Sequence, residues 1–434
     1  MSKVIRILLL LGVLITASIA IEAQADTPTI EVLQIKGTIN PVLVDYVKRG
    51  VEHAEDNNAT ALIIQLDTPG GLDIAMRDIV QAIVNAQVPV VVYVSPSGAR
   101  SASAGVFITI AAHVAVMAPN TAIGAASPVS IGAEGEEAMS ETMKAKVVND
   151  AAAYVRSIAG EHGRNIEWAE RAVREAVSAT EQEALELNVI DMVASDLNNL
   201  ISQLNGRQVT MLDGSLVTLD TQGATVNHVE MSWVEGFLYT IADPNIAYLL
   251  LSLAMLGIMV EISSPGLIFP GIVGGISLLL AFYSLGVLPV NYAGVLLIVL
   301  AFGLFVAEVF TATFGLFTAG GVTALVIGSL ILFKGGPLFQ VDPWLIAGVA
   351  ICLTTLFAFV IQRIIRAHRR QARTGREELM GKTAVVKTAL EPEGTVFFKG
   401  ERWTAVSEKG RVEPGEEVII TRVDGLTLYV IIRQ

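Results

Sequence analysis

From residue 95 the chain reads Ser95-Pro96-Ser97-Gly98-Ala99-Arg100-Ser101-Ala102-Ser103-Ala104-Gly105. This small-residue segment follows the apolar run Pro89 to Val94, and a second one, Thr68-Pro69-Gly70-Gly71, follows the apolar run Ala61 to Leu66. Such a turn between a buried strand and a helix lets the backbone approach a substrate and aims free N–H groups at it. A hydroxyl at the start of the helix is favoured by the helix dipole. This arrangement is typical of a serine nucleophile beside an oxyanion hole, and it predicts a hydrolase.

Around these turns, residues 26–205 alternate Val- and Ile-rich runs with helical stretches, which predicts an α/β domain with one well-buried core. The expected strands are Thr29 to Lys36, Ala61 to Asp67, Pro89 to Ser95, His113 to Ala118 and Val189 to Val193. The expected helices are Pro41 to Asp56, Leu72 to Ala86, Ser103 to Ala112, Ser140 to Glu161, Ile166 to Ala176 and Thr180 to Leu187. Asn165 and Thr180 are predicted N-caps, and Glu183 completes a capping box with Thr180.

The apolar excess of the chain predicts a membrane domain. Hydrophobic residues make up 53% of the chain and charged residues 16%, whereas charged residues are about 25% of an ordinary soluble protein. Within residues 246–366 we expect an all-α domain of five transmembrane helices: Ile246–Val260, Phe269–Val287, Tyr292–Phe314, Leu316–Phe333 and Trp344–Ile365. The first run is at the short limit, since a hydrocarbon core needs roughly 20 residues.

The two ends of the chain predict its orientation. Residues 1–25 have the layout of a cleavable secretory signal, with Lys3, Arg6, an apolar core and Ala23-Gln24-Ala25; the alternative is an uncleaved anchor helix. The densest basic run, Arg363 to Arg376, follows the last span, and positive-inside bias places it in the cytoplasm. An exported domain and a cytoplasmic flank need an odd number of spans, which five satisfies. We therefore expect a multi-pass protein of the cell (inner) membrane, with the α/β domain outside the cytoplasm.

An internal repeat runs through the membrane region. Glu261, Ser264-Pro265, Phe269 and Gly274-Gly275 are echoed about 47 residues later by Glu308, Thr311, Phe317 and Gly320-Gly321, which indicates a duplicated helical hairpin. Intramembrane carboxylates are by default candidates for ion or proton sites. Both glutamates lie beside an expected loop, however, which favours interfacial residues that cap Gly- and Pro-containing turns.

The remaining segments carry no chemistry of their own. Residues 206–245 form a polar connector, and residues 378–434 contain five short strands that predict a small OB-fold-like barrel, facing the cytoplasm and suited to protein contacts. A net charge of −13 without a basic stripe argues against nucleic acid as a partner. The single cysteine, Cys352, excludes a disulfide framework within the chain. No cofactor and no metal site is expected.

A serine nucleophile needs a base, and the residues alone leave several open. His53 and His162 lie on polar helix ends, and His113 opens an apolar strand, where a structural role is favoured over that of orienting a base. Lys144 and Lys146 lie on one expected helix among small apolar residues. A lysine acts as a general base only when burial lowers its pKa toward neutrality. Because these two lysines point to different sides of the helix, periodicity does not choose between them.

Three elements resemble the ClpP/crotonase-like serine peptidases: Asp67-Thr68-Pro69-Gly70-Gly71, the Ser-Ala-Ser-Ala-Gly run, and Glu183-Ala184-Leu185 through Val189-Ile190-Asp191. The whole architecture resembles the long form of the NfeD family, membrane-bound serine proteases encoded with stomatin-like partners. The resemblance implies Ser103 as the nucleophile. It implies Lys146, before Asn149 in Lys-x-x-Asn, as the general base, and the amides of Gly70, Gly71 and Ala104 as the oxyanion hole. Ser101 is the alternative nucleophile.

The resemblance also implies a target, the apolar C-terminal segment of a stomatin-like (SPFH/band 7) membrane protein, and self-association into a homo-oligomer. The region Val129 to Met139 is rich in Gly, Ala and Glu and lacks the aromatic or charged clusters that form a specific charged-residue pocket, which favours an extended hydrophobic peptide bound by β-addition. The competing interpretation is a non-enzymatic membrane scaffold that organises such a partner. A degenerate enzyme would have lost the serine, the lysine or the paired glycines, and all are present.

Overall fold

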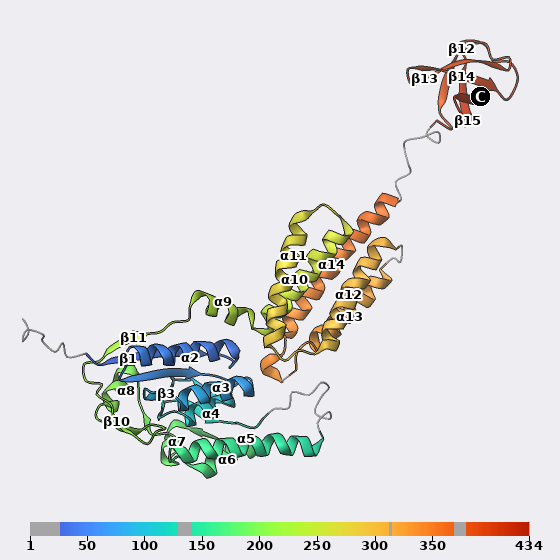
Figure 1. Ribbon diagram of the computed structural model, residues 1–434. Coiled ribbons are helices and arrows are strands. Elements are labelled where there is room, and N and C mark those ends of the chain that lie inside the picture. The colour runs from blue at the N-terminus through green and yellow to red at the C-terminus, as the bar shows by residue number, and fades with distance from the viewer. Residues whose placement is uncertain (1–26, 129–139, 312–314, 335, 369–378, 434) are drawn as a thin grey trace, which may run out of the picture. The chain divides into compact units, whose positions relative to one another are not determined.

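The computed structural model describes residues 27–128, 140–311, 315–334, 336–368 and 379–433 (Figure 1). The expected signal peptide, the loop at 129–139 and the end of the basic run therefore lie outside the described residues.

A six-stranded parallel sheet with the strand order β11-β1-β2-β3-β5-β8 forms the centre of the α/β domain. Its strands are β1 (Thr29–Lys36), β2 (Ala61–Asp67), β3 (Val90–Val94), β5 (Val114–Met117), β8 (Met192–Val193) and β11 (Thr225–His228). Every residue of β3 is buried, as is typical of a central parallel strand that is covered on both faces. The predicted α/β fold class is confirmed.

Helices cover both faces of this sheet. They are α2 (Pro41–Asp56), α3 (Asp73–Val84), α4 (Ala104–Ile110), α5 (Glu141–Glu161), α6 (Ile166–Arg174), α7 (Glu181–Glu186) and α8 (Leu197–Leu204). On β1, Leu33 and Ile35 belong to the apolar cluster with α2 to α7, and Ile30 and Val32 belong to the cluster with α8. This alternation follows the two-residue period of a strand. The predicted capping box at the start of α7 is present.

A second sheet of three short strands supports the segment that contains Ser103. It consists of β4 (Arg100–Ala102), β6 (Ala122–Gly124) and β7 (Ser178–Thr180), with β4 parallel and β7 antiparallel to β6. The sequence pattern did not predict these strands, because three residues are too few to show a period. Their pairing fixes the backbone on the N-terminal side of α4.

The polar connector contributes structure to the α/β domain. It contains the hairpin of β9 (Gln208–Thr210) and β10 (Leu216–Thr218), then β11, and then α9 (Trp233–Ile241). β11 pairs in parallel with β1 at the edge of the main sheet. The chain therefore adds an edge strand before it continues into the apolar helices.

Five apolar helices follow, in the order predicted: α10 (Pro244–Ser263), α11 (Ile268–Val287), α12 (Tyr292–Phe310), α13 (Leu316–Leu330) and α14 (Pro343–His368), with a short 3-10 turn, η1 (Pro337–Phe339), before the last. Among the described residues, four of these helices are long and apolar enough to cross a membrane. The helix α13 has 15 residues, so it is shorter than these four. At about 1.5 Å per residue it covers less than the hydrocarbon core of about 30 Å.

The internal repeat is visible in the helix contacts. A Cβ on Gly274 of α11 would approach the Ala254 carbonyl of α10, and one on Gly321 of α13 would approach the Ala301 carbonyl of α12, so the two hairpins pack alike. Glu308 is 3% exposed and its carboxylate accepts hydrogen bonds from the amides of Gly315 (2.8 Å) and Thr318 (3.0 Å). Glu308 thus caps α13, which supports the capping interpretation over an ion site.

The C-terminal domain is a closed five-stranded barrel with the order β12-β13-β14-β16-β15. Its strands are β12 (Thr383–Thr388), β13 (Glu393–Phe398), β14 (Glu401–Ser407), β15 (Glu417–Asp424) and β16 (Thr427–Ile432). Only β14 and β16 pair in parallel. The predicted small all-β barrel is confirmed, and its interior is filled by a separate apolar cluster.

Candidate active site

Ser103 stands at the sharp turn between β4 and α4. Its backbone has φ 53° and ψ −114°, a conformation that residues other than glycine rarely adopt. The Ser103 amide donates to the Gly124 carbonyl of β6 (3.2 Å), and the Ser103 carbonyl accepts from the Val106 amide in α4 (3.1 Å). The hydroxyl makes no capping hydrogen bond to the helix. These two backbone hydrogen bonds therefore hold Ser103 in a strained conformation. Its hydroxyl is half-buried and does not cap the helix.

The glycine loop after β2 lies directly against this hydroxyl. Gly70 has φ +121°, and a Cβ placed there would lie 2.7 Å from the Ser103 Cβ and 3.1 Å from Ser103 Oγ. A side chain at position 70 is thus excluded both by its backbone conformation and by its distance from the serine. The loop is joined to β4 through hydrogen bonds from the Thr68 amide to the Arg100 carbonyl (2.8 Å) and from the Ala102 amide to the Thr68 carbonyl (3.1 Å). The structure therefore brings together Gly70 and Ser103, which are far apart in the sequence.

Gly71 is held from the other side by the segment that follows β1. The Ile39 amide donates to the Gly70 carbonyl and the Leu72 amide donates to the Ile39 carbonyl, both at 2.9 Å. A Cβ on Gly71 would overlap the Ile39 backbone, so only glycine fits. The position of the glycine loop is therefore fixed by backbone contacts on both sides.

The three predicted oxyanion donors differ in their hydrogen bonding. The Gly70 amide donates to Thr68 Oγ1 (3.0 Å). In the described part of the chain, the Gly71 and Ala104 amides have no hydrogen-bond acceptor. Gly71 and Ala104 are therefore the two amides available to a ligand. Sequence reasoning missed Thr68, whose buried hydroxyl orients the loop; a hydroxyl residue between a buried strand and Pro69-Gly70 was the available signal.

Ser101, the alternative nucleophile, lies in the protein interior. It is 0% exposed, and its Oγ shares a hydrogen bond of 2.8 Å with Thr109 Oγ1 of α4. A Cβ on Gly105 would meet this hydroxyl at 2.8 Å, so the helix packs closely over it. A substrate carbonyl has no access to Ser101, and this geometry favours Ser103.

The two candidate lysines lie on the exposed N-terminal half of α5, the teal helix in Figure 1. Both side chains are exposed, and neither forms a hydrogen bond or ion pair with another residue that the structure describes. Met143 and Val147 beside them are also exposed, at 50% and 39%. The expected burial of a lysine base is therefore absent in the single chain, and no hydrogen bond joins Lys146 to Ser103 in the described residues.

His113 and His162 form a separate cluster away from the serine. His113 Nδ1 accepts a hydrogen bond from the Val90 amide (3.1 Å), and the His113 ring meets His162 edge to face at 5.7 Å. Arg164 next to them is 6% exposed and pairs with Asp191 at 2.7 Å. His113, His162 and Asp191 line a cavity of about 210 Å³ together with the residues of β9. This arrangement supports the structural role of His113. Across the described residues, no three metal-ligating side chains come together.

Acid is expected to destabilise the α/β domain through this cluster. Burial and the nearby Arg164 guanidinium lower the pKa of both His113 and His162 to about 4. Between pH 6.5 and 4 the unfolded chain therefore binds protons that the native state does not, so the free energy of unfolding falls as the pH falls through this range. The urea midpoint, followed by the fluorescence of buried Trp168, measures this effect. The double variant His113→Asn/His162→Gln should lose most of that slope; an unchanged slope would contradict the assignment.

Comparison with known proteins places the chain in a family. The model of the NfeD1b N-terminal domain matches residues 29–229, the NfeD integral membrane domain matches residues 245–363, and the NfeD-like C-terminal, partner-binding domain matches residues 376–430. A membrane-bound protease of Pyrococcus horikoshii is 40% identical over 98% of both chains. The chain belongs to the NfeD family. Membrane protein NfeD1b of Bacillus subtilis is 27% identical to this NfeD chain over 97% of both.

The solved structures include the 1510-N membrane-bound stomatin-specific protease, as a lysine-to-alanine mutant in complex with a substrate peptide. It is 37% identical to this NfeD chain, covers 50% of it and 98% of its own length, and has a TM-score of 0.46. Together with the family assignment, the relatives identify this NfeD chain as a membrane-bound enzyme of the protease class.

Proposed function

We propose that the chain is a membrane-bound serine endopeptidase that uses Ser103 as its nucleophile and Lys146 as its general base. The observation that carries this proposal is the close approach of the glycine loop to Ser103. A Cβ placed on Gly70 would lie only 3.1 Å from Ser103 Oγ. The Gly71 and Ala104 amides, which have no hydrogen-bond acceptor among the described residues, belong to the glycine loop and to the start of α4. A serine with two nearby free amides is the arrangement that acyl transfer requires.

In the proposed reaction the neutral Lys146 amine takes the proton of the Ser103 hydroxyl as Oγ attacks the peptide carbonyl carbon. The carbonyl oxygen becomes an oxyanion that accepts hydrogen bonds from Gly71 and Ala104. The lysine then gives its proton to the leaving amine, and an acyl-enzyme remains on Ser103. Water, deprotonated by the same lysine, attacks the ester carbonyl; the protonated lysine then returns the proton to Ser103 Oγ as the second peptide is released with a new carboxyl group.

The proposed base must lose its contact with water in the working enzyme. In the single chain Lys146 is exposed, and the apolar side chains of Met143 and Val147 on α5 are exposed with it. A hydrophobic substrate segment or a second copy of the chain that covers these side chains would desolvate the ammonium group and favour the neutral amine that a base requires. We therefore propose that the enzyme works as a homo-oligomer.

The proposed substrates are hydrophobic segments of membrane-associated proteins, a stomatin-like protein among them. Two comparisons support this: a relative of solved structure is named a stomatin-specific protease, and the matching C-terminal family is described as partner-binding. The membrane domain would keep the site near the bilayer, where membrane-associated substrates are concentrated.

A peptide digest tests this function. We expect the purified full chain to cut peptides with runs of Leu, Val or Phe at the scissile bond far faster than Lys-, Arg- or Glu-rich peptides of equal length, because the proposed contacts are apolar. Mass spectrometry of a peptide library gives the cleavage sites. Preference for a charged residue at the scissile bond would overturn the substrate proposal, and no cleavage of any peptide would favour the scaffold.

The α/β domain and the barrel are proposed to lie on opposite sides of the membrane, with the barrel in the cytoplasm. This requires α13 to cross together with the four longer helices. With Cys352 replaced by serine, a cysteine at exposed Ser157 should react with an impermeant maleimide added outside cells, and one at exposed Lys409 should react only after permeabilisation. Reaction of both from outside would mean that α13 does not cross.

A further inference from the structure

The helix α9 has an exposed aromatic face. Trp233 is 82% exposed, Val234 54% and Phe237 40%, and the rings of Trp233 and Phe237 stack with centroids 5.9 Å apart. Trp233 and Phe237 are one helical turn apart, so they share one side of the helix. We call Trp233, Val234 and Phe237 the α9 aromatic face. An exposed cluster of this kind on a helix with a polar opposite side marks a contact surface.

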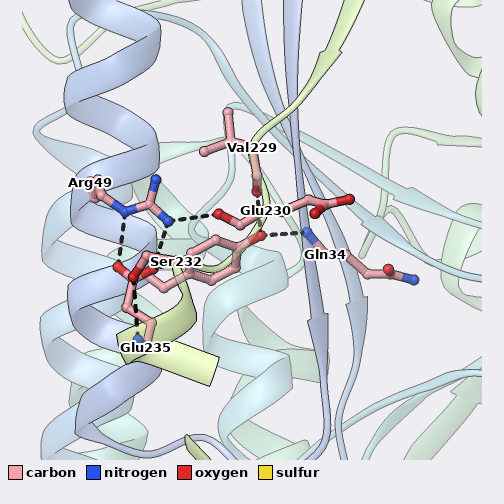
Figure 2. Close-up of polar contacts among 7 residues, drawn as sticks. Gln34, Arg49, Val229, Glu230, Ser232 and Glu235 are labelled. Carbon is pink, nitrogen blue, oxygen red and sulfur yellow. Dashed lines mark hydrogen bonds and ion pairs between the residues drawn. The ribbon is translucent and has the colours of Figure 1, made fainter. Parts of the chain in front are cut away.

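The opposite side of α9 is fixed to the α/β domain, as Figure 2 shows for its first turn. Glu235 accepts two hydrogen bonds from the Arg49 guanidinium, at 2.9 and 2.7 Å, and these bonds lower the pKa of the Glu235 carboxyl. Arg49 also donates to the Glu230 carbonyl (2.8 Å), and Tyr46 donates to the Val229 carbonyl (2.6 Å). The two elements that Arg49 joins, α2 and α9, are therefore held by charge-assisted bonds.

The C-terminal end of α9 leads directly into the membrane domain. Only Ala242 and Asp243 separate its last residue, Ile241, from Pro244 at the start of α10. Ser284 of α11 donates a hydrogen bond to the Ile241 carbonyl (2.6 Å). Because α10 is a candidate membrane span, α9 must lie within a few residues of the point where the chain enters the hydrocarbon.

We propose that the α9 aromatic face binds the lipid surface, with its side chains at the boundary between headgroups and acyl chains. Tryptophan is enriched at this depth because its ring is apolar and its N–H is polar. A helix with one apolar side lies in the interface plane rather than across the membrane. Two alternatives are that this face is exposed to water and that it contacts a second copy of the chain. The continuity with α10 favours lipid over both.

Trp233 fluorescence in the full chain tests this proposal. Trp168, Trp344 and Trp403 are replaced by phenylalanine, and the protein is placed in vesicles of phosphatidylcholine and phosphatidylglycerol. We expect an emission maximum at short wavelength, loss of most of the emission with lipids brominated near the glycerol end of the acyl chains, and weaker quenching with lipids brominated near the chain terminus. If acrylamide quenches the Trp233 emission and neither bromolipid does, the aromatic face is exposed to water. Emission insensitive to all quenchers means that protein covers it. Either result overturns the proposal.

A second measurement keeps the native tryptophans. In the Cys352→Ser background, Val234→Cys carries an environment-sensitive dye, and Ser202→Cys on α8, which is also exposed, is the matched control. The dye at position 234 should shift to shorter wavelength when the protein moves from detergent to vesicles and should be quenched by the shallow bromolipid, while the dye at position 202 should stay accessible to aqueous quencher. Equal behaviour of the two dyes contradicts lipid contact.

Discussion

Replacement of Ser103 by alanine is expected to lower kcat/KM for an apolar peptide by about 10³-fold or more, because the substitution removes the proposed attacking oxygen. The fold should tolerate the change, since the Ser103 hydroxyl makes no capping hydrogen bond and the Ser103 backbone bonds to Gly124 and Val106 remain. The measurement is kcat/KM of the full chain on a fluorogenic peptide, with the urea midpoint of each variant as the folding control.

Ser101→Ala is the matched control for this substitution. It leaves Thr109 Oγ1 buried without its partner, which costs about 1–3 kcal/mol of stability. We expect its kcat/KM to stay within about tenfold of the parent value, since the proposed nucleophile is Ser103 and Ser101 is buried. The reverse pattern, with Ser103→Ala active and Ser101→Ala inactive but folded, would exchange the roles of the two serines.

Replacement of Lys146 by alanine is expected to lower kcat/KM by about 10²- to 10⁴-fold, the usual contribution of a general base. Lys146→Arg should be as inactive as Lys146→Ala, because a guanidinium keeps the positive charge but does not give up its proton in proteins. Single-turnover kinetics of the full chain in vesicles separate this loss from a loss of substrate binding.

Lys144→Ala is the control for the lysine assignment, since Lys144 lies two residues away on the same exposed part of α5. Its kcat/KM should change little. A large loss in Lys144→Ala with normal turnover in Lys146→Ala would move the base to Lys144, and normal turnover in both variants would exclude a lysine base on this helix.

Much of the α/β fold was predictable because its elements carry strong local signals. Helix α2 has a Pro at its first position, an Asn cap and a regular apolar face, and its predicted bounds, Pro41 to Asp56, are those observed. The strands β4, β6 and β7 have three residues each, and β11 is a largely exposed, polar edge strand. Their pairing depends on long-range contacts that no local pattern records.

The site was predictable to the same extent. Small residues after two buried strands indicated a serine beside an oxyanion hole, and in the structure Gly70 lies next to the Ser103 side chain. The surroundings of Lys146 were not predictable, because the apolar residues near it on α5 face solvent in the single chain instead of burying it. Sequence periodicity reports which residues share a helix face, but it does not report what covers that face.

The contact between α9 and the end of β1 has a consequence for how the enzyme responds to its surroundings. Tyr239 of α9 donates a hydrogen bond to the Lys36 carbonyl (2.9 Å), and its hydroxyl fills the space beside Gly37 where a side chain would otherwise stand. The Gly37 amide bonds the Asp67 carbonyl, and two residues later Ile39 bonds Gly70. A tilt of α9 would thus displace the backbone from Lys36 to Ile39, the short segment that also holds the glycine loop beside Ser103. The rate of peptide cleavage should then depend on the thickness and curvature of the membrane. We expect the same polypeptide to cut at different rates in bilayers of different composition.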